Sequence, residues 1–395
     1  MTNQFKTAFN HPFFKSEYTL AVVWGAIALF SIYKIIHAGH PDWDYLIFTH
    51  SFDHAWANMP LYPLYEEDTD YFLYGPTFAS LIAPFALLPD WVGMVIWELL
   101  ITFFLFFTIK CSWLTQYQKV FIGWFCAQEV LNCVLDAEVN TLLVSGLMLT
   151  FLLVEKERDE WATFFIAAGT MTKLFGIVGL LCFCFSKHKM RFCWTLLLWL
   201  VVFAVLPMLM FGFEYTCGEY VEWMKALMAK NEHNLLIDTR QNLSLLGFVR
   251  NFGAFIPNYS DLWVFVPCAL LFAAPLLRFS QYKYIAFRET MFASSLICIC
   301  ILSTSTEQSG YIIAMIGVAI WFTAAPWKRG WWAVALMVFA LVLTSFSSTD
   351  LFPRDFRKGI LVHYALKALP VSIIWFVMNW ELLTRNYVRK ESEER

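Results

Sequence analysis

Long apolar runs separated by short polar turns recur along the chain from residue 17 to residue 385. A transmembrane α-helix needs about 20 mostly apolar residues, and many of these runs approach that length. The pattern therefore predicts an all-α integral membrane protein. The predicted spans cover residues 17–37, 71–88, 91–109, 119–134, 137–154, 160–172, 174–186, 192–211, 262–277, 289–303, 308–325, 330–346 and 367–385.

Lysine and arginine residues in the short loops predict the orientation of the chain, because cytoplasmic loops are enriched in them. Basic turns occur at Lys156/Arg158, Lys187/Lys189/Arg191, Arg278/Lys283/Arg288 and Lys328/Arg329, and in the tail from Arg385 onward. We expect these five places to face the cytoplasm, and we expect the connections between them to face outward.

Thirteen full crossings would place the two termini on opposite sides of the membrane, so one predicted span must stay on one side. The weakest is 119–134, which polar side chains interrupt. These side chains are Gln128, Glu129 and Asn132. A segment that is buried in protein or lines a cavity tolerates such groups, which leaves about 12 transmembrane helices. This topology puts Lys110 and Lys119 outside. A single helix over 161–186 is an alternative way to obtain an even number of crossings.

Two long outer connections interrupt what we predict to be a single membrane domain over residues 1–395. The first, 38–70, contains no lysine or arginine. Its stretch 43–58 has apolar and aromatic positions that suit a helix lying at the membrane interface. The second connection, 213–261, contains an amphipathic stretch over 213–243, which also suits the membrane surface.

The composition agrees with a membrane protein and excludes other classes. Hydrophobic residues make up 59% and charged residues 15% of the chain, whereas soluble domains contain about 25% charged residues. The net charge of −3 argues against general binding to nucleic acid. Most of the ten cysteines lie in apolar runs, where they pack as small hydrophobic residues. No zinc-protease motif, glycine-rich phosphate loop or nucleophile elbow occurs.

Polar residues, which are costly at membrane depth, gather on the predicted outer side. They come from the loop 38–70, from residues 128–140, from Lys173, and from residues 240–242 and 307–308. A random scatter would not favour one side. The pattern therefore predicts a cavity that opens to the outer face beneath the loop 38–70.

Four of these residues have two interpretations each. Asp42 and Asp44 lie where the first span ends, so one of them can deprotonate an acceptor hydroxyl, or both can stabilise the start of the helix 43–58. Lys173 either snorkels from one long helix or marks a helix break that points an ammonium at a phosphate. Glu307 is either a loop carboxylate in water or part of the cavity wall.

Several short motifs follow one another along the chain. They are Asp44-Tyr45 with Phe48, Leu61-Tyr62, Tyr74-Gly75-Pro76, Ala83-Pro84-Phe85, Leu88-Pro89, Glu138-Val139-Asn140, Lys173-Leu174-Phe175, Asn242-Leu243-Ser244 and the turn 305–311. In this order they resemble glycosyltransferase family 87, the polyprenyl-phosphate-mannose-dependent α-mannosyltransferases of the GT-C superfamily. The resemblance covers most of residues 17–325. Glu138 replaces the family's glutamine, and the late turn carries Glu307 instead of a Ser-Trp-x-His pattern.

The resemblance implies a GT-C-like bundle of transmembrane helices. It also implies an inverting glycosyltransferase that moves mannose, or another hexose or pentose, from a polyprenyl-phosphate donor to a lipid or glycan acceptor. Asp44 is the implied base, Lys173 and Arg240 are the candidates for the leaving phosphate, and no metal or cofactor is expected. We expect the active site to face outward from a bacterial cytoplasmic membrane. The predicted substrate-binding residues are Asp42, Tyr45, His54, Tyr62, Tyr74, Glu138, Asn140, Lys173, Arg240, Asn242 and Glu307.

A secondary transporter or a flippase-like protein is the alternative, because buried charges and broken helices also occur in transporters. Transporters commonly contain two related halves, and the sequence contains no such repeat. A non-catalytic membrane scaffold is a third interpretation. A channel is the least favoured class, because no filter-like segment occurs.

Overall fold

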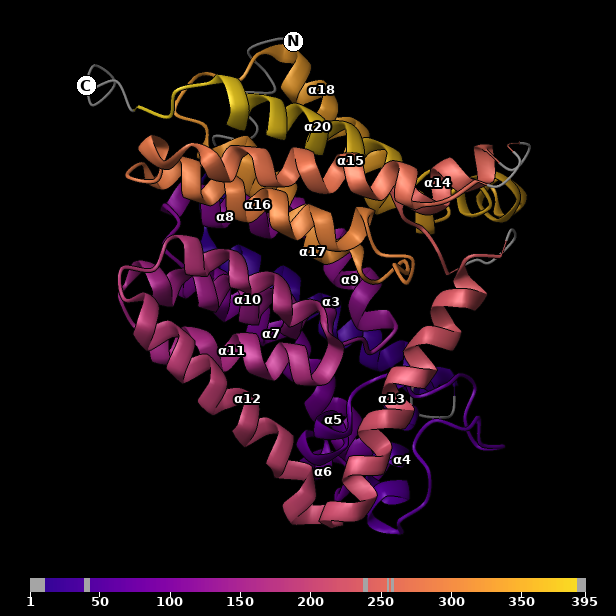
Figure 1. Cartoon of the computed structure of the whole chain (residues 1–395). Coiled ribbons are helices and arrows are strands. Elements are labelled where there is room, and N and C mark those ends of the chain that lie inside the picture. Colours follow the sequence, from indigo (N-terminus) through magenta and orange to yellow (C-terminus); the bar gives the residue numbers. More distant parts are fainter. Residues whose placement is uncertain (1–10, 39–42, 237–240, 254–255, 257–258, 389–395) are drawn as a thin grey trace. The chain divides into compact units, whose positions relative to one another are not determined.

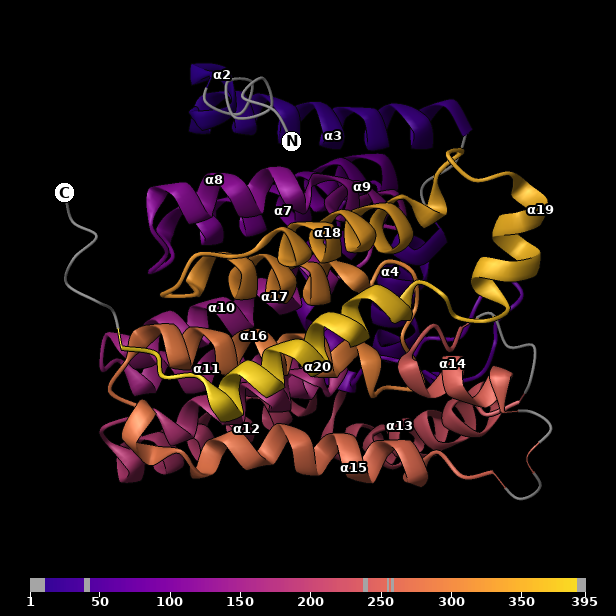
Figure 2. The same cartoon turned by 90° about the horizontal axis from the view of Figure 1, so that it is seen from above.

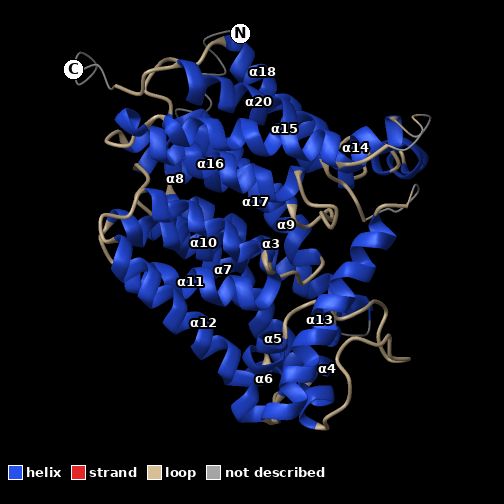
Figure 3. Ribbon diagram, in the orientation of Figure 1, coloured by secondary structure: helices blue, strands red, loops and turns tan. Residues whose placement is uncertain are grey.

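The structure is a computed structural model that describes residues 11–38, 43–236, 241–253, 256 and 259–388. Within these ranges every regular element is a helix and no strand occurs (Figure 3). Four helical stretches there are long and apolar enough to cross a membrane: Glu17–Ala38, Asp90–Cys111, Lys189–Phe211 and Trp331–Ser348. The predicted all-α class is confirmed, whereas the count of about 12 crossings stays a prediction.

The chain divides into two compact units, Met1–Ala229 and Lys230–Arg395, which can be followed by colour in Figure 1. The helices of the first unit are α2 (Pro12–Lys15), α3 (Glu17–Ala38), α4 (Trp43–Trp56), α5 (Pro76–Leu81), α6 (Ala83–Ala86), α7 (Asp90–Cys111), α8 (Gln116–Phe125), α9 (Ala127–Leu135), α10 (Asn140–Glu155), α11 (Asp159–Lys173), the 3₁₀-helix η1 (Phe175–Cys184), α12 (Lys189–Phe211) and most of α13 (Phe213–Asn234). That residues 1–395 form one membrane domain stays a prediction.

The long helices of the first unit pack side by side. α10 packs between α7 and α11, and α11 also packs against α12 (Figure 1). The Nε1 of Trp97, in α7, donates a hydrogen bond of 2.8 Å to the carbonyl oxygen of Ala137, just before α10. This bond joins the early turns of α7 to the beginning of α10. The two helices therefore begin at the same end of the unit.

The predicted span 71–88 is wrong, because the segment does not form one helix. It contains the short helices α5 and α6, which begin with Pro76 and with Ala83-Pro84. Proline suits the first turn of a helix but cannot donate a hydrogen bond from a helix interior. The second proline therefore ends one helix and starts another, although the segment is apolar throughout.

The segment 119–134 was predicted not to cross, and it forms α8 and α9, which meet at Cys126. Trp24 Nε1 donates to the Gly123 carbonyl oxygen at 3.1 Å, and Ser31 Oγ donates to the Val134 carbonyl oxygen at 3.2 Å. The two helices therefore run in the same direction as α3. That this segment stays on one side of the membrane remains a prediction.

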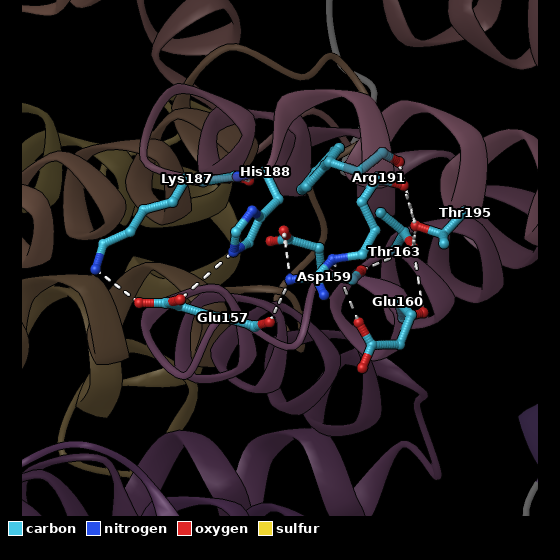
Figure 4. Close-up of polar contacts among 10 residues, drawn as sticks. Glu157, Asp159, Glu160, Thr163, Lys187, His188, Arg191 and Thr195 are labelled. Atoms are coloured by element: carbon cyan, nitrogen blue, oxygen red, sulfur yellow. Dashed lines mark hydrogen bonds and ion pairs between the residues drawn. The ribbon is translucent and has the colours of Figure 1, made fainter.

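A cluster of charged and hydroxyl side chains lies where α10 ends and where α11 and α12 begin (Figure 4). Lys187 Nζ donates to Glu157 Oε1 at 2.6 Å. Arg191 Nη2 donates to the Glu157 carbonyl oxygen at 2.6 Å and lies 3.6 Å from Asp159 Oδ2. The predicted basic turns at 156–158 and 187–191 therefore meet at one end of the unit, as a shared membrane side requires.

The second unit is also helical in its described residues. Its helices are α14 (Leu245–Phe252), α15 (Leu262–Ala273), the 3₁₀-helices η2 (Ala274–Leu277) and η3 (Phe279–Gln281), α16 (Ile285–Ile301), α17 (Tyr311–Ala324), α18 (Trp331–Phe339), the π-helix η4 (Ala340–Ser345), the 3₁₀-helix η5 (Phe346–Ser348), α19 (Arg354–Phe356), the π-helix η6 (Arg357–Val362) and α20 (Ala368–Thr384). α16 packs against α17 and α20, and these three helices enclose the core of the unit (Figure 2).

A buried ion pair joins the C-terminal ends of α17 and α20. Arg329 Nη1 lies 2.5 Å from Glu381 Oε1, and the two side chains are only 7% and 5% exposed. Trp321 Nε1 donates to the other carboxylate oxygen at 2.8 Å. The guanidinium carbon lies 4.2 Å from the centre of the Trp321 ring. These contacts tie three side chains into one enclosed network.

Candidate active site

Lys173 lies at the C-terminus of α11, where the chain turns back on itself. Leu174 has a φ of +28°, and η1 begins at Phe175. The turn brings η1 so close to α11 that a Cβ on Gly176 would lie 2.3 Å from the backbone nitrogen of Thr170, a distance that no larger residue accommodates. Of the two interpretations of Lys173, the helix break is confirmed and the single helix over 161–186 is wrong.

The lysine lies among three side chains from distant parts of the chain. Lys173 Nζ donates to Tyr74 Oη at 3.2 Å, to Glu138 Oε2 at 3.3 Å and to Asn140 Oδ1 at 3.1 Å. Tyr74 Oη in turn donates to Glu138 Oε2 at 2.9 Å. We call these four residues the Lys173 centre. The buried carboxylate compensates the ammonium charge, which would otherwise be costly in a partly dry site.

Backbone contacts hold Tyr74 in this centre. The Gly75 amide donates to the Thr172 carbonyl oxygen at 2.9 Å, and a Cβ on Gly75 would lie 2.2 Å from the Met171 carbonyl oxygen. Tyr62 Oη donates to the Tyr74 carbonyl oxygen at 3.1 Å. Burial, and then the nearby Glu219 carboxylate, raise the pKa of Tyr62 well above its usual value, so its hydroxyl stays protonated as a donor.

An apolar groove of about 380 Å³ leads away from the Lys173 centre. Side chains of α5, α6, α7, α10 and α11 line it, including Phe85, Phe104 and Phe165. Of the described residues along it, Lys173 alone carries a charge. The groove therefore has an apolar body and one cationic end, which suits a molecule with an apolar chain and an anionic head.

The predicted base, Asp44, is half-buried in the first turn of α4. Phe48 lies one turn later on the same helix face, and its ring packs against the rings of Tyr74 and Trp97 at 5.1 and 6.0 Å. This face of α4 therefore packs against Tyr74, a member of the Lys173 centre. A carboxylate in the first turn also suits the helix dipole, so both interpretations of Asp44 stay compatible with its position.

The other predicted residues of this helix serve its packing. Tyr45 is fully buried, and its hydroxyl donates to the Phe85 carbonyl oxygen over 3.5 Å. His54 Nε2 lies 3.2 Å from Glu67 Oε1. The neighbouring His50 and Asp68 form a second such pair, at 2.7 Å, which the sequence analysis missed. Two histidines four residues apart on α4, followed by the acidic stretch 66–70, are the sequence signal for these two ion pairs.

Two predicted residues, Asn242 and Glu307, belong to the second unit. Asn242 is 4% exposed, and its side chain bonds to residues close to it in the sequence. Its Nδ2 donates to the Asn234 carbonyl oxygen at 3.2 Å, and its Oδ1 accepts from Ser244 Oγ at 2.6 Å. Glu307 is half-buried in the late turn. The Leu243 amide donates to the Thr306 carbonyl oxygen at 2.9 Å, so these two predicted motifs meet.

Asp42 and Arg240 lie outside the described residues. Of the predicted site, the structure thus brings together Tyr74, Glu138, Asn140 and Lys173, with Tyr62 in contact through a backbone carbonyl. In the part of the chain that the structure describes, no three His, Cys, Asp or Glu side chains are placed to share a metal ion. That the protein needs no metal or cofactor stays a prediction.

Membrane-length helices and a charged centre at the end of an apolar groove define a membrane protein suited to amphipathic molecules. The family model of glycosyltransferase family 87 matches residues 72–304, and the chain belongs to this family. It is therefore a membrane glycosyltransferase. The matched range contains Tyr74, Glu138, Asn140 and Lys173. No curated protein matches the chain.

Proposed function

We propose that the protein is an inverting glycosyltransferase of the GT-C type, which moves a sugar from a polyprenyl-phosphate donor to a lipid or glycan acceptor at the outer face of the membrane. One observation carries the donor assignment: the ammonium of Lys173 lies at the end of an apolar groove between membrane helices. The groove takes the prenyl chain, and the ammonium binds the phosphate.

The contacts of Lys173 support a phosphate site. Tyr74 and Asn140 supply neutral acceptors to its Nζ, and a phosphate oxygen that replaces one of them adds the attraction between opposite charges to the hydrogen bond. Glu138 keeps the ammonium in place when the donor is absent. Arg240 is the second proposed phosphate ligand, because guanidinium binds phosphate through two donors.

In the proposed reaction, Asp44 accepts the proton of the acceptor hydroxyl. The acceptor oxygen then attacks the anomeric carbon, the bond from that carbon to the phosphate oxygen breaks, and polyprenyl phosphate leaves. A single displacement inverts the anomeric centre. Lys173 stabilises the negative charge that develops on the leaving phosphate. Mannose is the sugar that we would test first, since the family resemblance implies it.

The charges of the first unit support an outward-facing centre. Asp90 and Asp136 lie with Glu138 at the end where α7 and α10 begin, whereas the cluster of Figure 4 lies at the other end. Lys119 Nζ donates to the Lys110 carbonyl oxygen where α7 ends. With 71–88 outside and α8–α9 crossing, the total is still about 12 crossings, and both lysines face the cytoplasm.

The proposed phosphate site predicts the effect of changing Lys173. Membranes holding each variant are given polyprenyl-phosphate-[³H]mannose and related lipid-linked sugars. We expect Lys173→Ala to lower kcat/KM by about 10- to 10²-fold, because hydrogen bonds to charged groups contribute about 1.5–3 kcal/mol. Lys173→Arg keeps the charge and should retain more activity. Equal transfer by the alanine variant and the wild type would exclude the phosphate site.

The proposed prenyl site predicts that filling the groove weakens donor binding. Gly146 lines the groove on α10, and a Cβ there would lie 3.7 Å from the Phe165 ring, an ordinary contact. We therefore expect Gly146→Ala to keep wild-type kinetics and Gly146→Leu to raise the donor KM by about 10-fold or more, since burying a leucine-sized apolar group contributes about 1.5–3 kcal/mol. Unchanged KM in the leucine variant would place the prenyl chain elsewhere.

The same panel separates the enzyme from the alternative classes. A wild-type chain that transfers no sugar from any donor, but accelerates passage of a lipid-linked or anionic solute across proteoliposomes, is a transporter or flippase-like protein. Broken helices such as α11–η1 also occur in transporters, which is the reason for this comparison.

A further inference from the structure

Three side chains along α13 hold the backbone of the segment 57–75, which contains Tyr74 of the Lys173 centre. Tyr215 Oη donates to the Met59 carbonyl oxygen at 2.7 Å. Glu219 Oε2 accepts from the Leu61 amide at 2.9 Å. Trp223 Nε1 donates to the Leu73 carbonyl oxygen at 3.0 Å. Their four-residue spacing puts them on one face of the helix.

The middle contact is a buried one. Glu219 is 7% exposed, and burial raises the pKa of its carboxyl group. A buried backbone amide without an acceptor destabilises a structure more than an exposed one does. The Leu61 amide therefore needs the acceptor that Glu219 supplies. On the next turn Trp223 is 4% exposed, and its ring lies 3.0 Å from the position of a Cβ on Gly75.

A short series of contacts leads from this carboxylate to the lysine. Leu61 is followed by Tyr62, whose hydroxyl donates to the Tyr74 carbonyl oxygen at 3.1 Å. The Tyr74 hydroxyl donates to Glu138 and accepts from Lys173. Movement of the Leu61 backbone would therefore move the group that orients both charged side chains of the centre.

We propose that Glu219 is a positioning residue for sugar transfer: by holding the Leu61 amide, it keeps Tyr62 in place. Tyr62 in turn holds Tyr74 beside Glu138 and Lys173. The inference rests on the proposed function, and it extends the role of α13 beyond membrane attachment. It assigns Glu219 no contact with the donor or the acceptor. Loss of Glu219 would change the positions of the side chains in the Lys173 centre. The groove on α7, α10 and α11 would still bind the prenyl chain.

The kinetic test compares Glu219→Ala, Glu219→Gln and the matched control Glu222→Ala, whose carboxylate is exposed and pairs with Lys225. We expect Glu219→Ala to lower kcat by about 10- to 10²-fold, because small misplacements of reacting groups have effects of this size, with a donor KM within about threefold of wild type. Glutamine keeps an acceptor for the Leu61 amide and should restore kcat. Wild-type kcat in the alanine variant, or equal loss in the glutamine variant, overturns the proposal.

Hydrogen exchange of the purified full chain separates failure of this inference from failure of the proposed function. In Glu219→Ala we expect faster amide exchange across residues 59–75 and unchanged exchange in α10. Unchanged exchange across 59–75 overturns the positioning role whatever the activity is. Absence of transfer by the wild type overturns the proposed function and, with it, the catalytic part of the inference. If Glu219→Ala does not fold, Glu219→Leu, which keeps a side chain of similar size but offers no acceptor to the Leu61 amide, replaces it in both measurements.

Discussion

Replacing Asp44 by asparagine is expected to lower the rate of sugar transfer by about 10²- to 10⁴-fold, the usual contribution of a general base. Asparagine has the same shape as aspartate but cannot accept the proton of the acceptor hydroxyl. It also suits the beginning of a helix, so α4 should form normally. The measurement is transfer of radiolabelled mannose from polyprenyl-phosphate-mannose in membranes with equal amounts of wild-type and variant protein.

The matched control for this variant is Asp53→Asn, which removes another carboxylate from the same helix. Asp53 is exposed near the other end of α4, and we expect near-wild-type transfer from its variant. If Asp44→Asn transfers as fast as the wild type, Asp44 only stabilises the helix start. The base must then be sought among Asp42, Glu138 and Glu307.

Replacing Glu381 by alanine is expected to lower the free energy of unfolding by about 3–5 kcal/mol, the usual result of removing one partner of a buried ion pair. The Arg329 guanidinium would lose its counterion, and the Trp321 indole N–H would lose its acceptor. Both groups would stay enclosed at the ends of α17 and α20. Thermal and denaturant unfolding of the purified protein in detergent micelles measures the loss.

The exposed pair Lys225–Glu222 supplies the comparison for this prediction. Surface ion pairs contribute about 0–1 kcal/mol, so Glu222→Ala should unfold almost as the wild type does. A loss below about 1 kcal/mol in Glu381→Ala would mean that the network is solvated or repacks. Arg329→Met combined with Glu381→Leu should recover much of the stability, because apolar replacements of buried pairs are often neutral.

Hydrophobic pattern predicts the long helices of this chain well and the short ones poorly. The predicted spans 17–37, 91–109 and 192–211 agree with α3, α7 and α12 within a few residues, since each is a continuous apolar run. The run 71–88 is equally apolar, but its prolines divide it into two short helices. In 119–134 the polar residues Glu129 and Asn132 are buried inside the unit, so their side chains pack against protein, and the path of this segment through the membrane stays a prediction.

In the candidate site, the sequence predicted the residues but not the contacts between them. Family motifs predicted Tyr74, Glu138, Asn140 and Lys173 as site residues, and the structure brings these four together. Their hydrogen bonds join segments up to 99 positions apart, which no local pattern specifies. Glu219 was missed for the same reason. Its significance comes from contact with the Leu61 amide, a backbone group that every non-proline residue possesses.

The length of the apolar groove has a consequence for how the enzyme is assayed. On α10 it extends from Val139 to Leu147, about 12 Å along the helix axis, which is less than half of the about 30 Å hydrocarbon core. If the donor is the proposed polyprenyl phosphate, a long prenyl chain held there by its first units leaves the rest among the surrounding lipids. Such a donor and its product would exchange by lateral diffusion within the bilayer, and the relevant substrate concentration would be a mole fraction of membrane lipid. Diluting the donor with inert lipid should then slow the reaction even when its amount per volume is constant.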